Sequence, residues 1–179
     1  PLAKGFGLFA QLNTNYRIFK LPVFNEFYSY KAHSGDVWLE GRDQQDHVLK
    51  NSFLADSTTG VQIFDGEVYD TIIVGNSGIG IQEPRNKFGA GQETRGGIHF
   101  MDGQGGRKKA ALKNIKFLNP QDAAVVFQAK EGGDGNSESF ITMESLEVLD
   151  DSRPLLMTDN QPGETTRGGS FVNLKQVGD

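Results

Sequence analysis

The sequence of 179 residues contains no cysteine, only three histidines and a single tryptophan. The lack of cysteine excludes a disulfide-stapled scaffold, a thiolate metal site and a cysteine nucleophile. Three histidines without a His-x-x-His spacing fit a zinc site poorly. No apolar run approaches the ~18 residues of a membrane helix, so no membrane span is expected. Lys and Arg number 18 against 23 Asp and Glu. Because no basic face is evident, nucleic acid is not an expected partner.

Glycine and short apolar runs dominate what is present. The chain has 23 glycines, 13 phenylalanines and almost no helical periodicity. Apolar runs of about 3–6 residues, such as 61–64, 71–74 and 98–100, end at Gly, Asn, Asp or Ser, which is typical of strands and turns. The segment 122–129 fits either a short helix or a buried strand. These runs predict an all-β fold.

The strand-like runs also repeat. Asn25-x-Phe27 returns as Asn51-x-Phe53, a spacing of 26 (51 − 25). Units of about 20–30 residues with very short strands are typical of solenoids. We therefore predict a right-handed parallel β-helix in which Phe27 and Phe53 share one interior column. The repeated Asn is expected to satisfy backbone groups at a tight turn of the coil.

The predicted β-helix is a single domain over residues 1–179 and a portion of a longer protein. A β-sandwich is the alternative, because Asp65-Gly66 and Asp102-Gly103 are typical of hairpin turns. Three segments rich in Gly and polar residues are expected to be loop insertions between turns of the coil: 82–97, 130–139 and 161–169.

Three motifs then suggest a family. The chain has Val-Trp-Leu-Glu-Gly at 37–41, Lys-Asn-Ser-Phe-Leu-Ala-Asp at 50–56 and Gly-Ile-His-Phe-Met-Asp-Gly at 97–103. This set resembles the parallel β-helix region of cell-surface hyaluronidases of the transmembrane protein 2 type, the cell-migration-inducing hyaluronan-binding protein and fibrocystin-like proteins. The chain departs from the family pattern at Leu54, which is inserted, and at Met101, where the family has Tyr.

The resemblance implies an extracellular or cell-surface protein that works on or beside a polysaccharide such as hyaluronan. The matched motifs look like strand-forming positions and not like a catalytic set. We therefore expect a β-helix module with a structural, self-associating or glycan-contacting role. The alternative is a polysaccharide-cleaving enzyme of hyaluronidase type, a hydrolase or lyase, with part of its site outside this chain. Expected partners are a polysaccharide or neighbouring protein chains at the open ends of the coil.

The candidate catalytic residues are Asp36, Asp56, Asp102 and His99. Hydrolysis of a glycosidic bond needs two carboxylates about 5–10 Å apart, which neighbouring strands of a coil can supply. Elimination from a uronic-acid polymer instead needs a base, such as His99, and a cation. The structural alternative carries more weight, since each Asp suits a turn that accepts backbone N–H bonds and His99 suits packing within a strand.

The candidate glycan-binding residues are Tyr28, Tyr30, Trp38 and Arg42. Aromatic faces are frequent anchors for ligands, and Arg42 is a cation available to a uronate. Tyr28 and Tyr30 have the opposite strand parity to Phe27, which predicts that they point outward. Trp38 alternates with two apolar neighbours, which favours a place in the core.

No cofactor and no metal is expected, apart from calcium. Two oxygen-rich loops, at 41–46 and 132–136, leave calcium open. Neither loop follows the spacing of a helix–loop–helix calcium site.

Overall fold

Strands alone make up the described part of the chain. In the computed structural model, every regular element among the described residues is a β-strand. None of these residues forms a helix that could cross a membrane. The all-β prediction is therefore confirmed. The structure describes residues 6–11, 22–30, 32, 35–40, 47–57, 59–63, 66–75, 96–101, 108–120, 123–128, 139–149, 155–158 and 170–176.

The strands form two parallel sheets, one of six strands and one of eight. The six-stranded sheet contains, in order, β1 (Phe6–Gln11), β4 (Gly35–Glu40), β7 (Val61–Ile63), β9 (Gly96–Met101), β11 (Ala123–Gln128) and β13 (Leu156–Thr158). The eight-stranded sheet contains β14 (Ser170–Gln176), β12 (Ser139–Leu149), β10 (Lys108–Leu118), β8 (Gly66–Val74), β5 (His47–Lys50) and β2 (Val23–Asn25), with β6 (Phe53–Ala55) beside β8 and β3 (Tyr28–Tyr30) beside β6.

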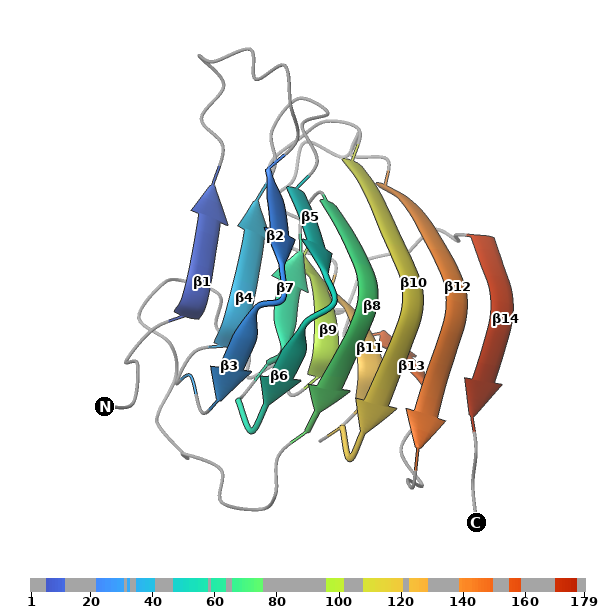
Figure 1. Cartoon of the computed structure of the whole chain (residues 1–179). Coiled ribbons are helices and arrows are strands. Elements are labelled where there is room, and N and C mark those ends of the chain that lie inside the picture. The colour runs from blue at the N-terminus through green and yellow to red at the C-terminus, as the bar shows by residue number, and fades with distance from the viewer. Residues whose placement is uncertain are drawn as a thin grey trace.

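The chain passes back and forth between these two sheets. The strands β1, β4 and β7 belong to one sheet, and the strands that lie between them in the sequence belong to the other. Neighbouring strands pair in parallel throughout both sheets. Figure 1 shows the sheets facing each other, with the strands of one running opposite to the strands of the other. Parallel neighbours need a crossover connection, and here the crossover includes a strand of the facing sheet.

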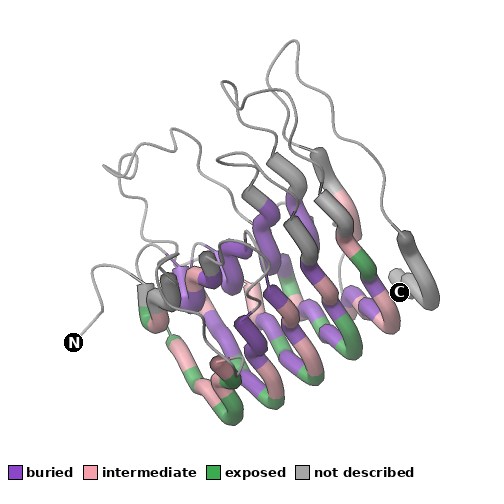
Figure 2. Tube along the Cα trace, turned by 90° about the horizontal axis from the view of Figure 1, so that it is seen from above, coloured by how far each residue is buried: buried purple, intermediate pink, exposed green. Residues whose placement is uncertain are grey.

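Neighbouring strands of the eight-stranded sheet each bend at a residue with left-handed backbone conformation. At Asn114 φ is 55°, and the Asn114 side-chain amide donates a hydrogen bond of 2.9 Å to Oδ1 of Asp70 on the neighbouring strand. The Asn51 amide likewise donates to Oδ1 of Asn25 over 2.8 Å. Asn and Asp tolerate this conformation better than other non-glycine residues. Figure 2 shows exposed positions at the outer side of these bends. The bend residues are Glu26, Asn51, Asp70, Asn114 and Ser145.

We expect Asn114→Val to lower the free energy of unfolding by about 1–2 kcal/mol, because a β-branched residue is strained at positive φ. The measurement is urea unfolding of the purified chain. Asn114→Gly is the matched control, since it keeps the left-handed backbone and loses only the hydrogen bond to Asp70. A valine variant as stable as the glycine variant contradicts the strain argument.

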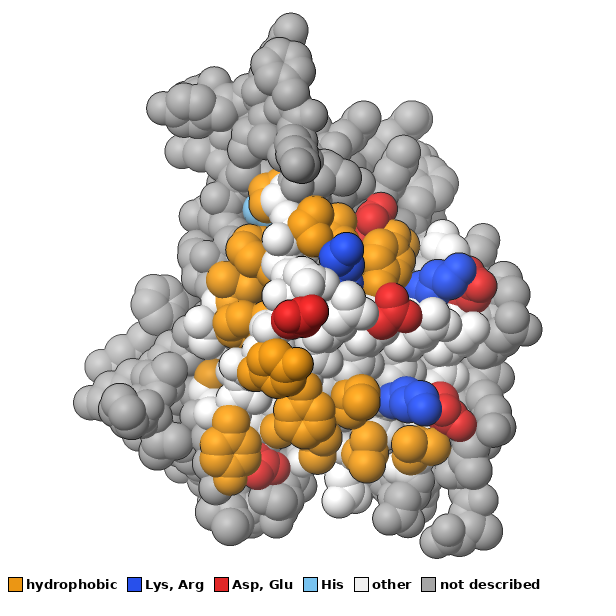
Figure 3. Space-filling model, in the orientation of Figure 1, with side chains coloured by type: hydrophobic (Ala, Val, Ile, Leu, Met, Phe, Trp, Pro, Cys, Tyr) orange, Lys and Arg blue, Asp and Glu red, His pale blue; other side chains and the backbone are white. Residues whose placement is uncertain are grey.

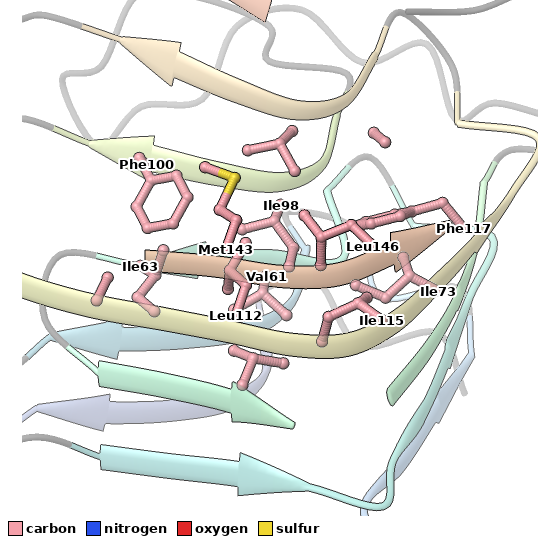
Figure 4. Packing of buried hydrophobic residues seen from close by; sticks show 14 of the residues in the cluster. Val61, Ile63, Ile73, Ile98, Phe100, Leu112, Ile115, Phe117, Met143 and Leu146 are labelled. Atoms are coloured by element: carbon pink, nitrogen blue, oxygen red, sulfur yellow. The ribbon is translucent and has the colours of Figure 1, made fainter. Parts of the chain in front are cut away.

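The apolar core lies between the two sheets. Val61 and Ile98 face it from the six-stranded sheet, and Leu112 and Phe117 face it from the eight-stranded sheet, each at most 1% exposed. Figure 4 shows these side chains interleaved. Gly97 leaves room for the Phe117 ring, because a Cβ at Gly97 would lie 2.5 Å from Cδ1 of Phe117. Close packing between the sheets at this point therefore requires a glycine at position 97.

The prediction of a right-handed parallel β-helix is wrong. The described residues form two facing parallel sheets, and a closed solenoid is not shown. Phe27 and Phe53 do not share a column, because Phe53 pairs with Tyr28 at a spacing of 25 (53 − 28). A slip of one residue moves a side chain to the opposite face of a strand. Phe27 accordingly packs against the core, while Phe53 points outward and is 40% exposed.

The smaller predictions have mixed outcomes. The segment 122–129 contains a strand, β11, and not a helix. Gly66 begins strand β8, which pairs in parallel, so no hairpin forms there. Of the predicted loops, 96–97 instead begin β9 and residue 139 begins β12. The remaining parts of those loops lie outside the described residues, as do Asp102 and Gly103.

Candidate functional site

Exposed aromatic and apolar side chains gather on the outer face of the eight-stranded sheet. We call Tyr28, Tyr30, Phe53 and Ile72 the aromatic strip. Their side chains are 71%, 65%, 40% and 38% exposed, respectively. Figure 3 shows apolar side chains clustered on this face of the molecule. Contiguous exposed apolar surface on a soluble domain is typical of a binding site.

The register of three strands builds the strip. Tyr28 on β3 pairs with Phe53 on β6, which pairs with Ile72 on β8. Each of the three residues comes two positions after a left-handed bend residue, so each points away from the core. Neighbouring strands are about 4.8 Å apart, which places the two rings one strand spacing from each other. The strip is therefore fixed by backbone pairing and not by a mobile loop.

Charged pairs border the strip along the same sheet. Ile72 pairs with Lys116 on β10, which pairs with Glu147 on β12. The Lys116 ammonium lies 4.0 Å from the Glu147 carboxylate. A second pair, Lys113 and Glu144, is 3.2 Å apart on the same two strands. The outer face of this sheet thus changes from apolar at β3 to charged, with the charges paired, at β10 and β12.

The structure places Trp38 and His99 in the six-stranded sheet, away from the strip. Trp38, Gln62, His99 and Val126 are successive register partners across four strands. Trp38 alternates with Val37, which faces the core, so the Trp38 ring lies on the opposite face and is half-buried. The core position predicted for Trp38 is therefore wrong, because its neighbours Val37 and Leu39 are the residues of β4 that face the core. His99 is only 1% exposed, which leaves it inaccessible to a polymer in this structure.

Asp36 is a buried carboxyl held by hydroxyl groups. It is 1% exposed, and the Ser57 hydroxyl donates a hydrogen bond of 2.7 Å to its Oδ1. Ser57 in turn accepts the backbone N–H of Ala32 over 2.9 Å. Burial raises the pKa of Asp36 to about 6, while hydrogen bonds from Ser29 and Ser57 oppose the rise and the Asp56 charge adds to it. Asp36 thus lies buried at the start of β4 and does not open onto the strip.

Of the other predicted site residues, Asp56 lies near Asp36 and the rest lie outside the described residues. Asp56 lies close enough to Asp36 for their charges to interact, at a left-handed position with φ of 57°. Asp102, Arg42 and the two calcium-loop candidates lie outside the described residues. Within the described ranges, no three His, Asp or Glu side chains come together as a metal-binding group.

Sequence reasoning placed Tyr28 and Tyr30 outward, and the structure does the same. It missed Phe53 and Ile72, which complete the strip. Aligning the two repeats with a spacing of 25 residues instead of 26 pairs Tyr28 with Phe53, and this alignment would have placed Phe53 outward. The chain matches no protein-family profile, no curated protein and no solved structure, so the resemblance to the hyaluronidases stays a prediction.

Proposed function

We propose that this chain is a glycan-contacting module that binds a polysaccharide along the aromatic strip, as part of an extracellular or cell-surface protein. The observation that carries the proposal is the in-register column of Tyr28, Phe53 and Ile72. Because strand pairing fixes the backbone positions from which the rings project, little backbone entropy is lost when a ligand arrives. Tyrosine adds a hydroxyl that can bond to a sugar hydroxyl while the ring covers the apolar sugar face.

The length of the strip also suits a polymer. A pyranose ring is comparable in length to the spacing of about 4.8 Å between strands, so successive sugars can meet Tyr28 and Phe53 in turn. Tyr30 lies two residues beyond Tyr28 on the same face and widens the contact surface. A flat exposed surface of this kind favours side-on contact with a chain over enclosure of a small molecule.

The polysaccharide-cleaving alternative has less support among the described residues. Hydrolysis needs two accessible carboxylates on either side of the bond. Asp36 has a raised pKa, but it is 1% exposed and bonded to Ser57. The aromatic strip itself contains no carboxylate. We therefore favour binding without cleavage.

Replacing both Tyr28 and Phe53 by Ala is expected to weaken polysaccharide binding about tenfold or more, as for aromatic anchors in other interfaces. Affinity gel electrophoresis against a panel of soluble polysaccharides measures the loss. Thr142→Ala is the matched control, because Thr142 is exposed on the same sheet outside the strip. Equal binding by the double variant and the control contradicts the proposal.

A further inference from the structure

We infer that the aromatic strip selects an uncharged polysaccharide over a uronic-acid polymer. This inference rests on the proposed function and names the class of glycan. It comes from the charges that surround the strip on the outer face of the eight-stranded sheet. Where the structure describes side chains from β2 to β12, this face carries three lysines and five acidic residues: Lys50, Lys113 and Lys116 against Glu26, Glu67, Asp70, Glu144 and Glu147.

Two of the three described lysines on this face, Lys113 and Lys116, are paired with carboxylates. Lys116, next in register after Ile72, lies 4.0 Å from the Glu147 carboxylate. Lys113 lies 3.2 Å from Glu144. An incoming uronate would have to compete with these carboxylates for each ammonium group. It would also approach a face on which acidic groups outnumber basic ones among the described side chains, in a chain of net charge −5.

Carboxylates at the bends add to this repulsion. Asp70 and Glu26 lie at exposed bend positions, two residues before Ile72 and Tyr28 respectively. A polymer lying along the strip would therefore pass beside a carboxylate at the first and third of three bends, Glu26 and Asp70, with the neutral Asn51 between them. The same carboxylates and the Asn51 side chain can hydrogen-bond to the hydroxyl groups of a neutral sugar. Charge and hydrogen-bonding capacity thus point to the same class of ligand.

The test compares neutral and anionic oligosaccharides of equal length by isothermal titration calorimetry. The neutral probes are cellohexaose, laminarihexaose and mannohexaose, and the anionic probe is a hyaluronan hexasaccharide. We expect at least one neutral hexamer to bind at least tenfold more tightly than the hyaluronan fragment. Its dissociation constant should change less than twofold between low and high salt, because screening acts on charge pairs and not on stacking.

A charge variant gives an independent readout. Glu147→Gln removes the carboxylate beside Lys116, so we expect hyaluronan binding to improve about threefold while neutral binding stays within twofold. Lys116→Gln is the matched variant and should leave neutral binding within twofold. Circular dichroism verifies that both variants are folded.

The possible outcomes separate the two proposals. Tighter, salt-sensitive binding of hyaluronan that Phe53→Ala weakens overturns the inference and leaves the proposed function standing. Binding of a neutral hexamer that Phe53→Ala abolishes supports both. If no hexamer of either charge binds, the proposed function fails and the inference fails with it.

Discussion

Replacing Phe117 by Ala is expected to lower the free energy of unfolding by about 3–5 kcal/mol, the usual loss for a fully buried phenylalanine. The Phe117 side chain is 0% exposed and lies between the two sheets. It also touches the backbone at Gly97, where no side chain intervenes. Truncation therefore leaves a cavity that neither sheet can fill without moving. Urea denaturation monitored by circular dichroism measures the loss.

A double-variant cycle with Gly97 identifies the cause. Gly97→Ala alone should cost about 1–3 kcal/mol, because its Cβ would lie 2.5 Å from Cδ1 of Phe117. When Phe117 is already Ala, the same change at Gly97 should cost less, since the ring it meets is gone. Ile72→Ala is the surface control and should have a much smaller effect at 38% exposure. Strictly additive costs at 97 and 117 contradict the proposed contact.

Asp36→Asn is expected to stabilise the protein at pH 7 and to have little effect near pH 4. The pKa of Asp36 rises from 3.8 to about 6 in the folded protein, chiefly because the carboxyl is buried. A rise of this size corresponds to roughly 3 kcal/mol of preference for the neutral form. Asparagine is always neutral and can still accept the hydrogen bond from Ser57.

The pH dependence has a definite sign. Since the folded pKa lies above the unfolded one, the folded protein holds the proton more tightly than the unfolded chain. The wild type therefore loses stability as the pH rises from about 4 to about 6, by roughly 3 kcal/mol in total from this group. The asparagine variant should lack this decrease. Denaturant midpoints measured across pH 4–7 test the difference.

Ser57→Ala provides the control for this prediction. The Ser57 hydroxyl donates to Asp36 and lowers its pKa, so its removal should raise that pKa further and steepen the loss of stability near neutral pH. Combining Ser57→Ala with Asp36→Asn should remove the steepening. An asparagine variant that shows the same pH profile as the wild type contradicts the role given to Asp36.

Local patterning could be read from the sequence, whereas pairing register could not. The runs around Val61, Ile73 and Ile98 form strands, as their composition predicts. Their partners depend on where the chain bends. At a bend residue such as Glu26, with φ of 58°, the alternation of inward and outward side chains along the strand is interrupted. Glu has no preference for left-handed backbone, so the sequence does not reveal this bend. Matching Asn25 with Asn51 therefore placed the two repeats one residue out of register, because Asn25 pairs with Lys50.

The same limit applied to the candidate site. Tyr28 and Tyr30 lie on one strand, so parity alone places both outward. Phe53 joins them only through cross-strand pairing, which a single sequence does not reveal. Asp36 looked like a turn residue open to ligands. In the folded structure it is buried and accepts a hydrogen bond from Ser57, which is 21 residues away in the chain.

The order of strands also determines how the protein responds to tension. In the eight-stranded sheet, β2 and β14 lie at opposite ends of the path, and every strand between them pairs side by side in parallel. The interstrand hydrogen bonds run along that path, so a pull between the two end strands acts on every strand pair in series, and the weakest pair opens first. We therefore expect the sheet to open stepwise under tension, and each opened strand pair to add free chain length before the next pair opens.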